Sequence, residues 1–187
     1  MTRLTKEQRR DVNVARKIIE EELLPDPVTR SHCLEIFAKS IAIAKQATPK
    51  RWGVTLYPAG EQVVRLTVGM IYVYNIKPGR VALTIDGLSQ NPAVIQNYLS
   101  PSNFEELRRV SEGKKEPLPN APQFVSAVDA VWCWFSPDKI HEAFPLIEDA
   151  YFSLIRIAAT TRLNPAVPKA HSPSVIEYLR EQVQGLF

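Results

Sequence analysis

The sequence predicts an α+β fold, in which helices pack around a curved antiparallel sheet. Two observations support this class. Apolar residues recur at helical spacing in residues 6–48 and again in the last third of the chain, whereas residues 52–86 alternate with period two. Short turns separate the segments of the alternating region, so its strands form an antiparallel meander. The length of 187 residues fits a single domain, 1–187.

The composition is that of an ordinary globular protein. Hydrophobic residues make up 45% and charged residues 23%, which excludes a disordered chain, a collagen, a coiled-coil rod and a disulfide-rich toxin. The formal net charge is +3, well below that of a dedicated nucleic-acid coat protein. A small basic patch is compatible with this balance, although the composition does not require one.

Residues 1–48 are predicted to form a helical hairpin. Thr5 and Gln8 have the spacing of a capping box, which predicts a first helix over residues 6–24. The tripeptide Pro25-Asp26-Pro27 ends that helix and begins the next one. The second helix is apolar around much of its circumference, so it must be covered on two sides. We expect that cover to come from the first helix, the sheet and the helix around 146–158, rather than from a second subunit.

The meander of residues 52–86 is followed by helices and a further strand region. A long β run over 63–76 contains Gly69, where we expect a bend, because glycine inside a strand often marks one. Lys77-Pro78-Gly79-Arg80 has the signature of a type II turn. Residues 123–135 are rich in β-formers and supply one or more further strands. Helix starts are indicated by the pairs Asn91-Pro92, Ser100-Pro101, Ser136-Pro137 and Ser172-Pro173, and Pro145 is expected to restart a helix.

Motifs for cofactors and metals are missing from the sequence. It has no G-x-G-x-x-G, Walker loop, G-x-S-x-G or H-E-x-x-H, and with seven glycines a phosphate-binding loop is not expected. The candidate zinc ligands lack clustered spacing; they are His32, Cys33, Cys133, His141 and His171. We therefore expect no cofactor and no metal.

The two cysteines and the apolar runs bear on the compartment. Cys33 and Cys133 lie 100 residues apart in apolar surroundings, which favours buried, reduced thiols over a disulfide. The polar segment 1–10 is not a secretory signal, and no apolar run approaches the ~20 residues that span a membrane. These features predict a cytoplasmic protein without a membrane partner.

One arrangement of acidic and basic residues suggests catalysis. Asp86 ends a predicted strand, and Glu112-Gly113-Lys114 follows, which is the order of residues in a metal-dependent nuclease. In that class the Glu and Lys lie on a strand beside the Asp. Here they fall at a helix end, where a lysine is favoured by the helix dipole. An enzyme with a site near Asp86 remains an alternative.

The stronger feature is a set of basic and aromatic residues along the predicted sheet. Phosphates pair with Arg or Lys, and bases stack on exposed aromatic rings. Trp132 and Trp134 face one way from their strand and Cys133 the other, whereas Tyr72 and Tyr74 share the stripe of Leu66 and are assigned to the core. The candidate nucleic-acid-binding residues are Arg51, Arg65, Lys77, Arg80, Trp132 and Trp134.

Two stretches resemble known proteins. Residues 65–73 (RLTVGMIYV), after WGVTL at 52–56, and residues 171–179 (HSPSVIEYL) resemble DNA-recognition modules of bacterial restriction and anti-phage defence proteins. The resemblance implies a domain that examines DNA and a separate nuclease partner that cuts it. It assigns no role to an individual residue.

These observations lead to three hypotheses. The first is a non-catalytic nucleic-acid recognition domain, in which Arg65, Lys77 and Arg80 contact phosphate and the two tryptophans contact a base. The second is a protein-interaction or assembly subunit that uses the helical hairpin or the last helix. The third is the enzyme with a site near Asp86.

Overall fold

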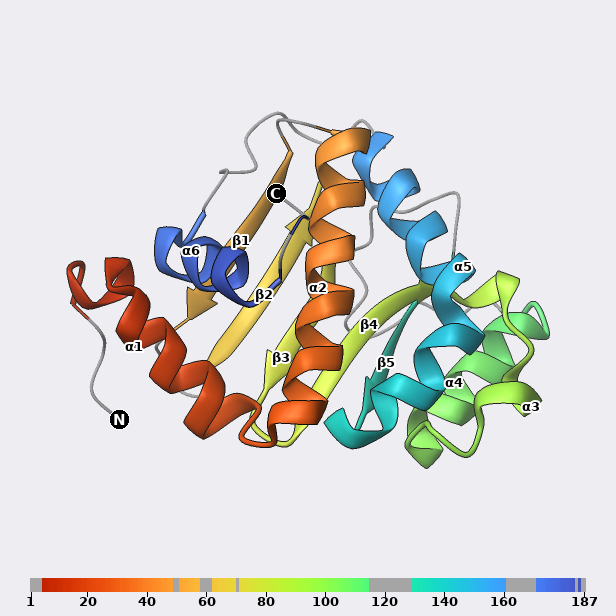
Figure 1. The fold of residues 1–187 in the computed structure, drawn as a ribbon. Coiled ribbons are helices and arrows are strands. Elements are labelled where there is room, and N and C mark those ends of the chain that lie inside the picture. The colour runs from red at the N-terminus through yellow and green to blue at the C-terminus, as the bar shows by residue number, and fades with distance from the viewer. Residues whose placement is uncertain are drawn as a thin grey trace.

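The computed structural model describes residues 5–48, 51–57, 62–69, 71–114, 129–160, 171–183 and 185. Its centre is a five-stranded antiparallel sheet, in which strands β1 to β5 lie side by side in chain order (Figure 1). The strands are β1 (Trp52–Tyr57), β2 (Val63–Val68), β3 (Ile71–Lys77), β4 (Arg80–Asp86) and β5 (Ala130–Phe135). The predicted α+β class is confirmed. Of the predicted strand region 123–135, residues 123–128 lie outside the described residues.

The helices precede, interrupt and follow the strands. The α-helices are α1 (Val12–Lys17), α2 (Pro27–Ala47), α3 (Pro92–Ile95), α4 (Pro101–Ser111), α5 (Ile140–Thr160) and α6 (Pro173–Gln182). Short 3-10 turns are η1 (Gln8–Arg10), η3 (Gly87–Ser89) and η4 (Pro137–Lys139), and η2 (Ile18–Leu23) is a π-helical turn that continues α1. No helix within the described ranges combines the length and apolarity needed to cross a membrane.

Local capping signals position several helix starts. The Asp26 side chain accepts a hydrogen bond from the Thr29 N–H at 2.7 Å, and Pro27 occupies the first turn of α2. Asn91 and Ser100 cap α3 and α4 in the same way, each followed by a proline. The helical hairpin at the N-terminus is therefore confirmed, together with the residues that begin its second helix.

The first helix begins later than the sequence predicts. Thr5 and Gln8 do form the capping box, with Thr5 N–H donating to Gln8 Oε1 at 2.8 Å and Gln8 N–H to Thr5 Oγ1 at 3.2 Å. That box closes only the 3-10 turn η1. Asp11 then caps α1 by accepting from the Asn13 N–H at 2.9 Å. The extended backbone at Asp11 separates the two pieces, so a continuous helix over 6–24 is wrong.

Pro145 does not restart a helix. It lies inside α5, which runs unbroken from Ile140 to Thr160. Proline removes one backbone hydrogen bond from a helix. Ala143 and Ile147 on either side of it are both fully buried, and this continuous packing holds the helix together through the proline.

The predicted long strand over 63–76 is two strands. Val68 at the end of β2 pairs with Ile71 at the start of β3, so the chain reverses at Gly69. Gly69 has a φ of 58°, and a Cβ at this position would lie 2.4 Å from the Ala158 carbonyl oxygen. Only glycine adopts this backbone and approach without strain. Gly69 is thus the site of a reversal, and the predicted bend within one strand is wrong.

Strand β3 contains one extra residue relative to β2. Leu66 pairs with Tyr74 and Thr67 pairs with Tyr72, so Val73 has no partner on β2. Because a bulge of one residue inverts the alternation beyond it, Tyr72 leaves the stripe to which Tyr74 belongs. Tyr74 is fully buried, whereas Tyr72 is 37% exposed. The assignment of Tyr72 to the core is therefore wrong.

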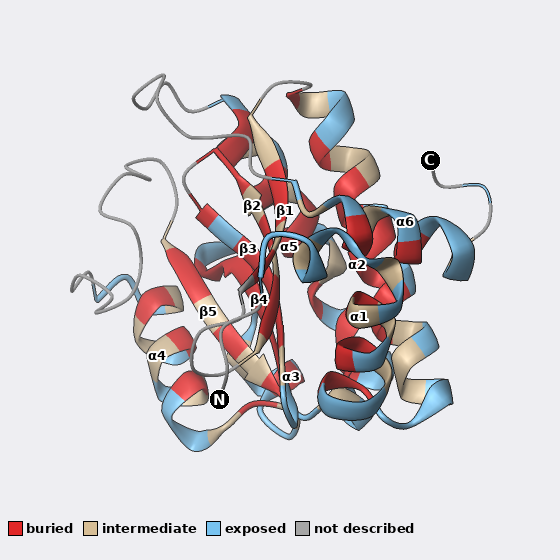
Figure 2. Ribbon diagram, turned by 90° about the vertical axis from the view of Figure 1, so that its left-hand side faces the viewer, coloured by how far each residue is buried: buried red, intermediate tan, exposed pale blue. Residues whose placement is uncertain are grey.

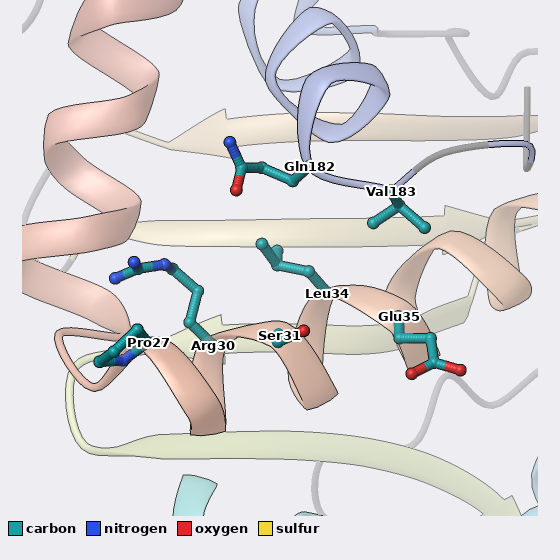
Figure 3. Close-up of a pocket in the computed structure, with 7 residues that line it drawn as sticks. All are labelled: Pro27, Arg30, Ser31, Leu34, Glu35, Gln182 and Val183. Carbon is teal, nitrogen blue, oxygen red and sulfur yellow. The ribbon is translucent and has the colours of Figure 1, made fainter.

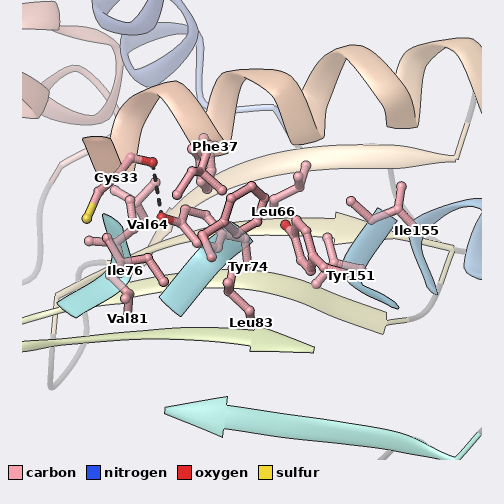
Figure 4. Packing of buried hydrophobic residues seen from close by; sticks show 14 of the residues in the cluster. Cys33, Phe37, Val64, Leu66, Tyr74, Ile76, Val81, Leu83, Tyr151 and Ile155 are labelled. Carbon is pink, nitrogen blue, oxygen red and sulfur yellow. Dashed lines mark hydrogen bonds between the residues drawn. The ribbon is translucent and has the colours of Figure 1, made fainter. Parts of the chain in front are cut away.

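Helices α2 and α5 cover one face of the sheet, and the hydrophobic core lies between these helices and that face (Figure 1). Tyr74 reaches from β3 toward α2, where its hydroxyl donates to the Cys33 carbonyl oxygen at 3.0 Å and its ring lies 5.0 Å from that of Phe37 (Figure 4). The sheet and α5 cover α2, as expected, and α6 also packs against it. The first helix does not provide the cover that the sequence predicted. Helix α1 packs chiefly against α6.

The two cysteines behave as predicted. Cys33 and Cys133 are free thiols, and neither exposes any surface. Both belong to the apolar cluster between the sheet and its covering helices. Removing an ionised thiolate from water is unfavourable, so burial raises the pKa of Cys33 to about 12 and also raises the pKa of Cys133.

Candidate nucleic-acid interface

The opposite face of the sheet carries two rows of outward residues that cross the strands. Side chains i and i+2 of a strand share one face, so paired residues of neighbouring strands line up. The first row is Thr55, Arg65, Asn75, Ala82 and Trp134, and the second is Gly53, Thr67 and Tyr72, continued by the pair Thr84 and Trp132. No residue of either row is acidic. Figure 2 shows α1, α2 and α6 on the other side of the sheet.

Aromatic rings and a guanidinium form a continuous series on this face. The Arg65 Cζ lies 4.2 Å from the centre of the Tyr72 ring. The Tyr72 and Trp132 ring centres are 6.3 Å apart, and those of Trp132 and Trp134 are 5.8 Å apart in an edge-to-face arrangement. These are the separations at which cations attract aromatic faces and rings attract one another.

The turn between β3 and β4 adds two cations at the end of the series. Lys77 and Arg80 pair across the turn, and Gly79 between them has a φ of 69°, as the third position of a type II turn requires. The Arg80 Cζ lies 4.7 Å from the centre of the Trp134 ring and the Lys77 Nζ lies 5.4 Å from it. We call Arg65, Tyr72, Lys77, Arg80, Trp132 and Trp134 the cation–aromatic face.

Hydrogen bonds hold two side chains of this face, Arg65 and Trp132, in place. The Tyr72 carbonyl oxygen accepts from the Trp132 Nε1–H at 3.1 Å and from the Thr84 hydroxyl at 2.7 Å. The Arg65 Nε–H donates to Asn75 Oδ1 at 2.6 Å. The indole of Trp132 is thereby tied to the backbone of β3, two strands away. Side chains that are fixed in this way lose little conformational entropy when a ligand binds.

Helix α4 braces the edge strand that carries the tryptophans. With its amide oriented so that both polar atoms are bonded, Asn103 accepts from the Trp134 N–H at 2.7 Å and donates to the Trp132 carbonyl at 3.2 Å. The amide thus imitates a residue of a sixth strand. It satisfies backbone groups that an open sheet edge would leave for another chain, and it fixes the position of β5.

The structure brings together five of the six predicted binding residues. Arg51 is the exception, because it precedes β1 beside the β2–β3 reversal, where its carbonyl oxygen accepts from the Gly69 N–H at 2.7 Å. Tyr72 joins the other five, although its alternation with Tyr74 predicts a core position. To place Tyr72 correctly, the sequence would have to indicate the bulge at Val73. The alternation of polar and apolar residues does not indicate it.

The residues of the possible enzyme site have structural roles. Asp86 caps the turn η3, with one carboxylate oxygen accepting from the Leu88 N–H at 3.2 Å and the other from the Ser89 hydroxyl at 2.8 Å. Glu112 pairs with Arg108 at 2.8 Å and with Lys114 at 3.0 Å at the end of α4. These hydrogen bonds and ion pairs account for the positions of Asp86, Glu112 and Lys114 as parts of the fold.

The candidate metal ligands do not form a metal-binding group in the described residues. His32 and His141 stack on each other, with ring centres 4.0 Å apart, and His171 meets Trp52 at 4.5 Å. In the part of the chain that the structure describes, no three His, Cys, Asp or Glu side chains form a group suited to a metal ion.

Two pockets lie on the helical side of the molecule. One of about 480 Å³ is lined by α2 and the end of α6, where Arg30 and Leu34 face Gln182 (Figure 3). The Arg30 guanidinium there donates to the Leu24 carbonyl at 3.0 Å, which explains its position. The other, of about 510 Å³, is lined by Trp52, His171 and residues of α6. Neither pocket includes a residue of the cation–aromatic face.

Comparisons with protein-family models, curated proteins and solved structures found no match for this chain. The chemistry of the cation–aromatic face is therefore the feature that bears on function. That face combines three positive side chains and three aromatic rings on a braced strand platform. Such a surface suits an anionic ligand that also carries flat rings.

Proposed function

We propose that this protein is a non-catalytic recognition domain for nucleic acid and that the cation–aromatic face is its binding surface. One observation supports this above all others. Three aromatic rings follow one another across the face, and cations contact both ends of the series: Arg65 lies over Tyr72, and Arg80 and Lys77 lie over Trp134. The two rows contain no acidic residue. A nucleic acid strand likewise offers flat bases that are flanked by phosphates.

In this proposal the two kinds of side chain have different tasks. Arg65, Lys77 and Arg80 pair with phosphates, which supplies affinity that falls with salt. Trp132 and Trp134 contact bases. The net charge of +3 is small, so the attraction comes from this local cluster rather than from the whole surface.

The sequence resemblance also suggests in which biological system such a domain would act. A restriction or antiviral defence protein in a bacterial cytoplasm would use such a domain to examine DNA, with a separate nuclease partner to cut it. The braced, ring-bearing surface supports the part of this proposal that concerns recognition.

The test is binding of a fluorescein-labelled oligonucleotide, measured by anisotropy at several salt concentrations. The wild-type chain is compared with Arg65→Gln, Lys77→Gln, Arg80→Gln and the triple variant. Each lost phosphate contact should lower the slope of log affinity against log salt by about 0.7–0.9. The triple variant should therefore lose most of the salt dependence as well as most of the affinity.

Lys39→Gln provides a matched control, because Lys39 lies on α2 on the helical side and pairs with Glu35 at 3.0 Å. It removes the same charge and should leave the affinity unchanged. If wild type shows no binding at low salt, or binding that does not respond to salt, the proposal is wrong. The protein-assembly hypothesis would then be the one to pursue.

A further inference from the structure

The centre of the cation–aromatic face contains a buried hydrogen-bond donor. Asn75 is 1% exposed and lies in the first row between Arg65 and Ala82. Its Oδ1 accepts from Arg65, which fixes the orientation of the amide. Its Nδ2 has no hydrogen-bond partner among the residues that the structure describes. A buried donor without a partner is unfavourable, so its retention needs an explanation.

The place between Asn75 and Trp134 is closed in this structure, because Asn75 and Ala82 are 1% and 0% exposed, and a flat ring would enter it only after the side chains above them move. Ala82 follows it in the row and bears only a methyl group, and Trp134 comes next. Neighbouring strands lie about 4.8 Å apart, so the backbones of Asn75 and Trp134 are separated by about 10 Å. A ring system that stacks on the Trp134 indole and extends over Ala82 would bring its edge to the Asn75 amide.

The side chains that lie over the Trp134 ring come from the turn between β3 and β4. Arg80 is exposed and lies over the ring, together with Lys77. A base that took the position of the Arg80 guanidinium on the Trp134 ring would direct Arg80 toward the phosphate of the same nucleotide. Asn75 Nδ2 is enclosed, so base binding at this place requires side chains of the face to move.

We infer, on the basis of the proposed function, that the ligand is single-stranded nucleic acid and that the face holds an unpaired base between Trp134 and Asn75. Stacking needs a free ring face, and the amide N–H needs an acceptor on the base edge, such as a pyrimidine carbonyl. The ring faces are hidden in a duplex, where bases stack on one another, whereas an unpaired strand offers a free ring face and a free carbonyl edge on the same base.

Tryptophan fluorescence tests this inference directly. The chain has three tryptophans, and Trp52→Phe leaves only the two on the face. That variant is titrated with an oligothymidylate, with an abasic strand of the same length and with a duplex of the same length. We expect quenching by oligothymidylate and at least tenfold weaker binding of the abasic strand and the duplex.

Variants of Trp134 and Asn75 test whether these two residues cause the preference for oligothymidylate. Trp134→Leu should weaken oligothymidylate binding about 5- to 150-fold, the effect of losing one stacked base, while Trp134→Phe keeps a ring and most of the affinity. Asn75→Ala should cost about 3- to 10-fold, the effect of one hydrogen bond. Both should leave binding of the abasic strand unchanged, and a thermal melt verifies that each variant is folded.

The experiment distinguishes failure of the single-strand inference from failure of the proposed function. Equal affinity for oligothymidylate, abasic strand and duplex, with salt dependence intact, overturns the single-strand inference and leaves nucleic-acid binding in place. Preferential binding of the duplex overturns it as well. If none of the three binds at low salt, both the inference and the proposed function are wrong.

Discussion

The two faces of the sheet are built from the same five strands and differ in almost every other respect. On the helix-covered face, Tyr74, Leu66 and Leu83 are fully buried against α2 and α5. On the cation–aromatic face, Tyr72 is 37% exposed and the two tryptophans are half-buried. Strand alternation separates the two sets, and the bulge at Val73 moves Tyr72 from the first set to the second.

The difference shows where stability and binding are located in this fold. Apolar burial of roughly 25 cal/mol per Å² accumulates on the covered face. The other face keeps rings and cations partly in water, where each contact contributes about 0.5–1 kcal/mol. A protein that used both faces for folding would bury the rings completely. The following predictions test this division, beginning with the largest effect.

Truncating the core on the covered face should have the largest cost. Phe37 is fully buried against Tyr74, so Phe37→Ala should lower the free energy of unfolding by about 3–5 kcal/mol, measured by urea denaturation. Trp134→Ala on the other face should cost less than half as much, because its ring is already partly exposed. Equal costs for the two variants would contradict the division between the faces.

The chain reversal at Gly69 should be the next most sensitive point. Gly69→Ala imposes a strained backbone worth roughly 1–3 kcal/mol, and it forces the Ala158 carbonyl to move as well. Gly79→Ala is the matched control, because its φ is also positive and a Cβ there would meet nothing within 4 Å. Gly69→Ala should therefore be the more destabilising of the two, and a neutral result would show that the reversal tolerates a side chain.

Alkaline pH should weaken the covered face through its buried thiols. Burial raises the folded-state pKa of Cys33 to about 12 and that of Cys133 as well, above the unfolded value of about 8.5. The unfolded state then releases protons first, so stability is complete below pH ~8.5 and falls above it. Each thiol should contribute a loss of about 1.4 kcal/mol per pH unit in that range.

Urea melts from pH 7 to 10 measure this loss, and Cys33→Ser and Cys133→Ser should each reduce its slope. Ellman's reagent provides an independent measurement at pH 8. Both thiols should be unreactive in the native protein and react fully in guanidinium. A fast native reaction of either thiol would place it at the surface.

The smallest effect on stability should come from the cations of the other face. Arg80→Gln removes a cation–π contact with Trp134 that is worth about 0.5–1 kcal/mol at an exposed site, so urea denaturation should detect at most that change. A loss above 2 kcal/mol would mean that Arg80 supports the fold rather than a ligand. The comparison between the two faces would then have to be revised.

Much of the fold was predictable because its signals are local. A capping residue acts within three positions, so the start of α2 at Asp26 and Pro27 follows from the sequence alone. Strand alternation likewise places Cys133 in the core and its two tryptophan neighbours on the opposite face. Five of the six predicted binding residues therefore lie together, although their contacts with a ligand remain a prediction.

The errors arose where a local signal had two structural outcomes. Gly69 in an apolar run is compatible with a bend or with a reversal, and the approach of the Ala158 carbonyl selects the reversal. Pro145 is compatible with a new helix start, and packing on the sheet carries α5 through it instead. Neither outcome is visible until residues distant in sequence are neighbours in space.

The sequence by itself determined which residues alternate, which residues cap helices and which strands carry tryptophan and arginine. Only the tertiary structure decided the bulge at Val73, the contact of Arg65 with Tyr72 and the unpartnered amide of Asn75. The physical reason is that pairing register depends on the combined hydrogen bonds and packing of neighbouring strands. Those interactions join residues that the linear pattern of one strand cannot relate.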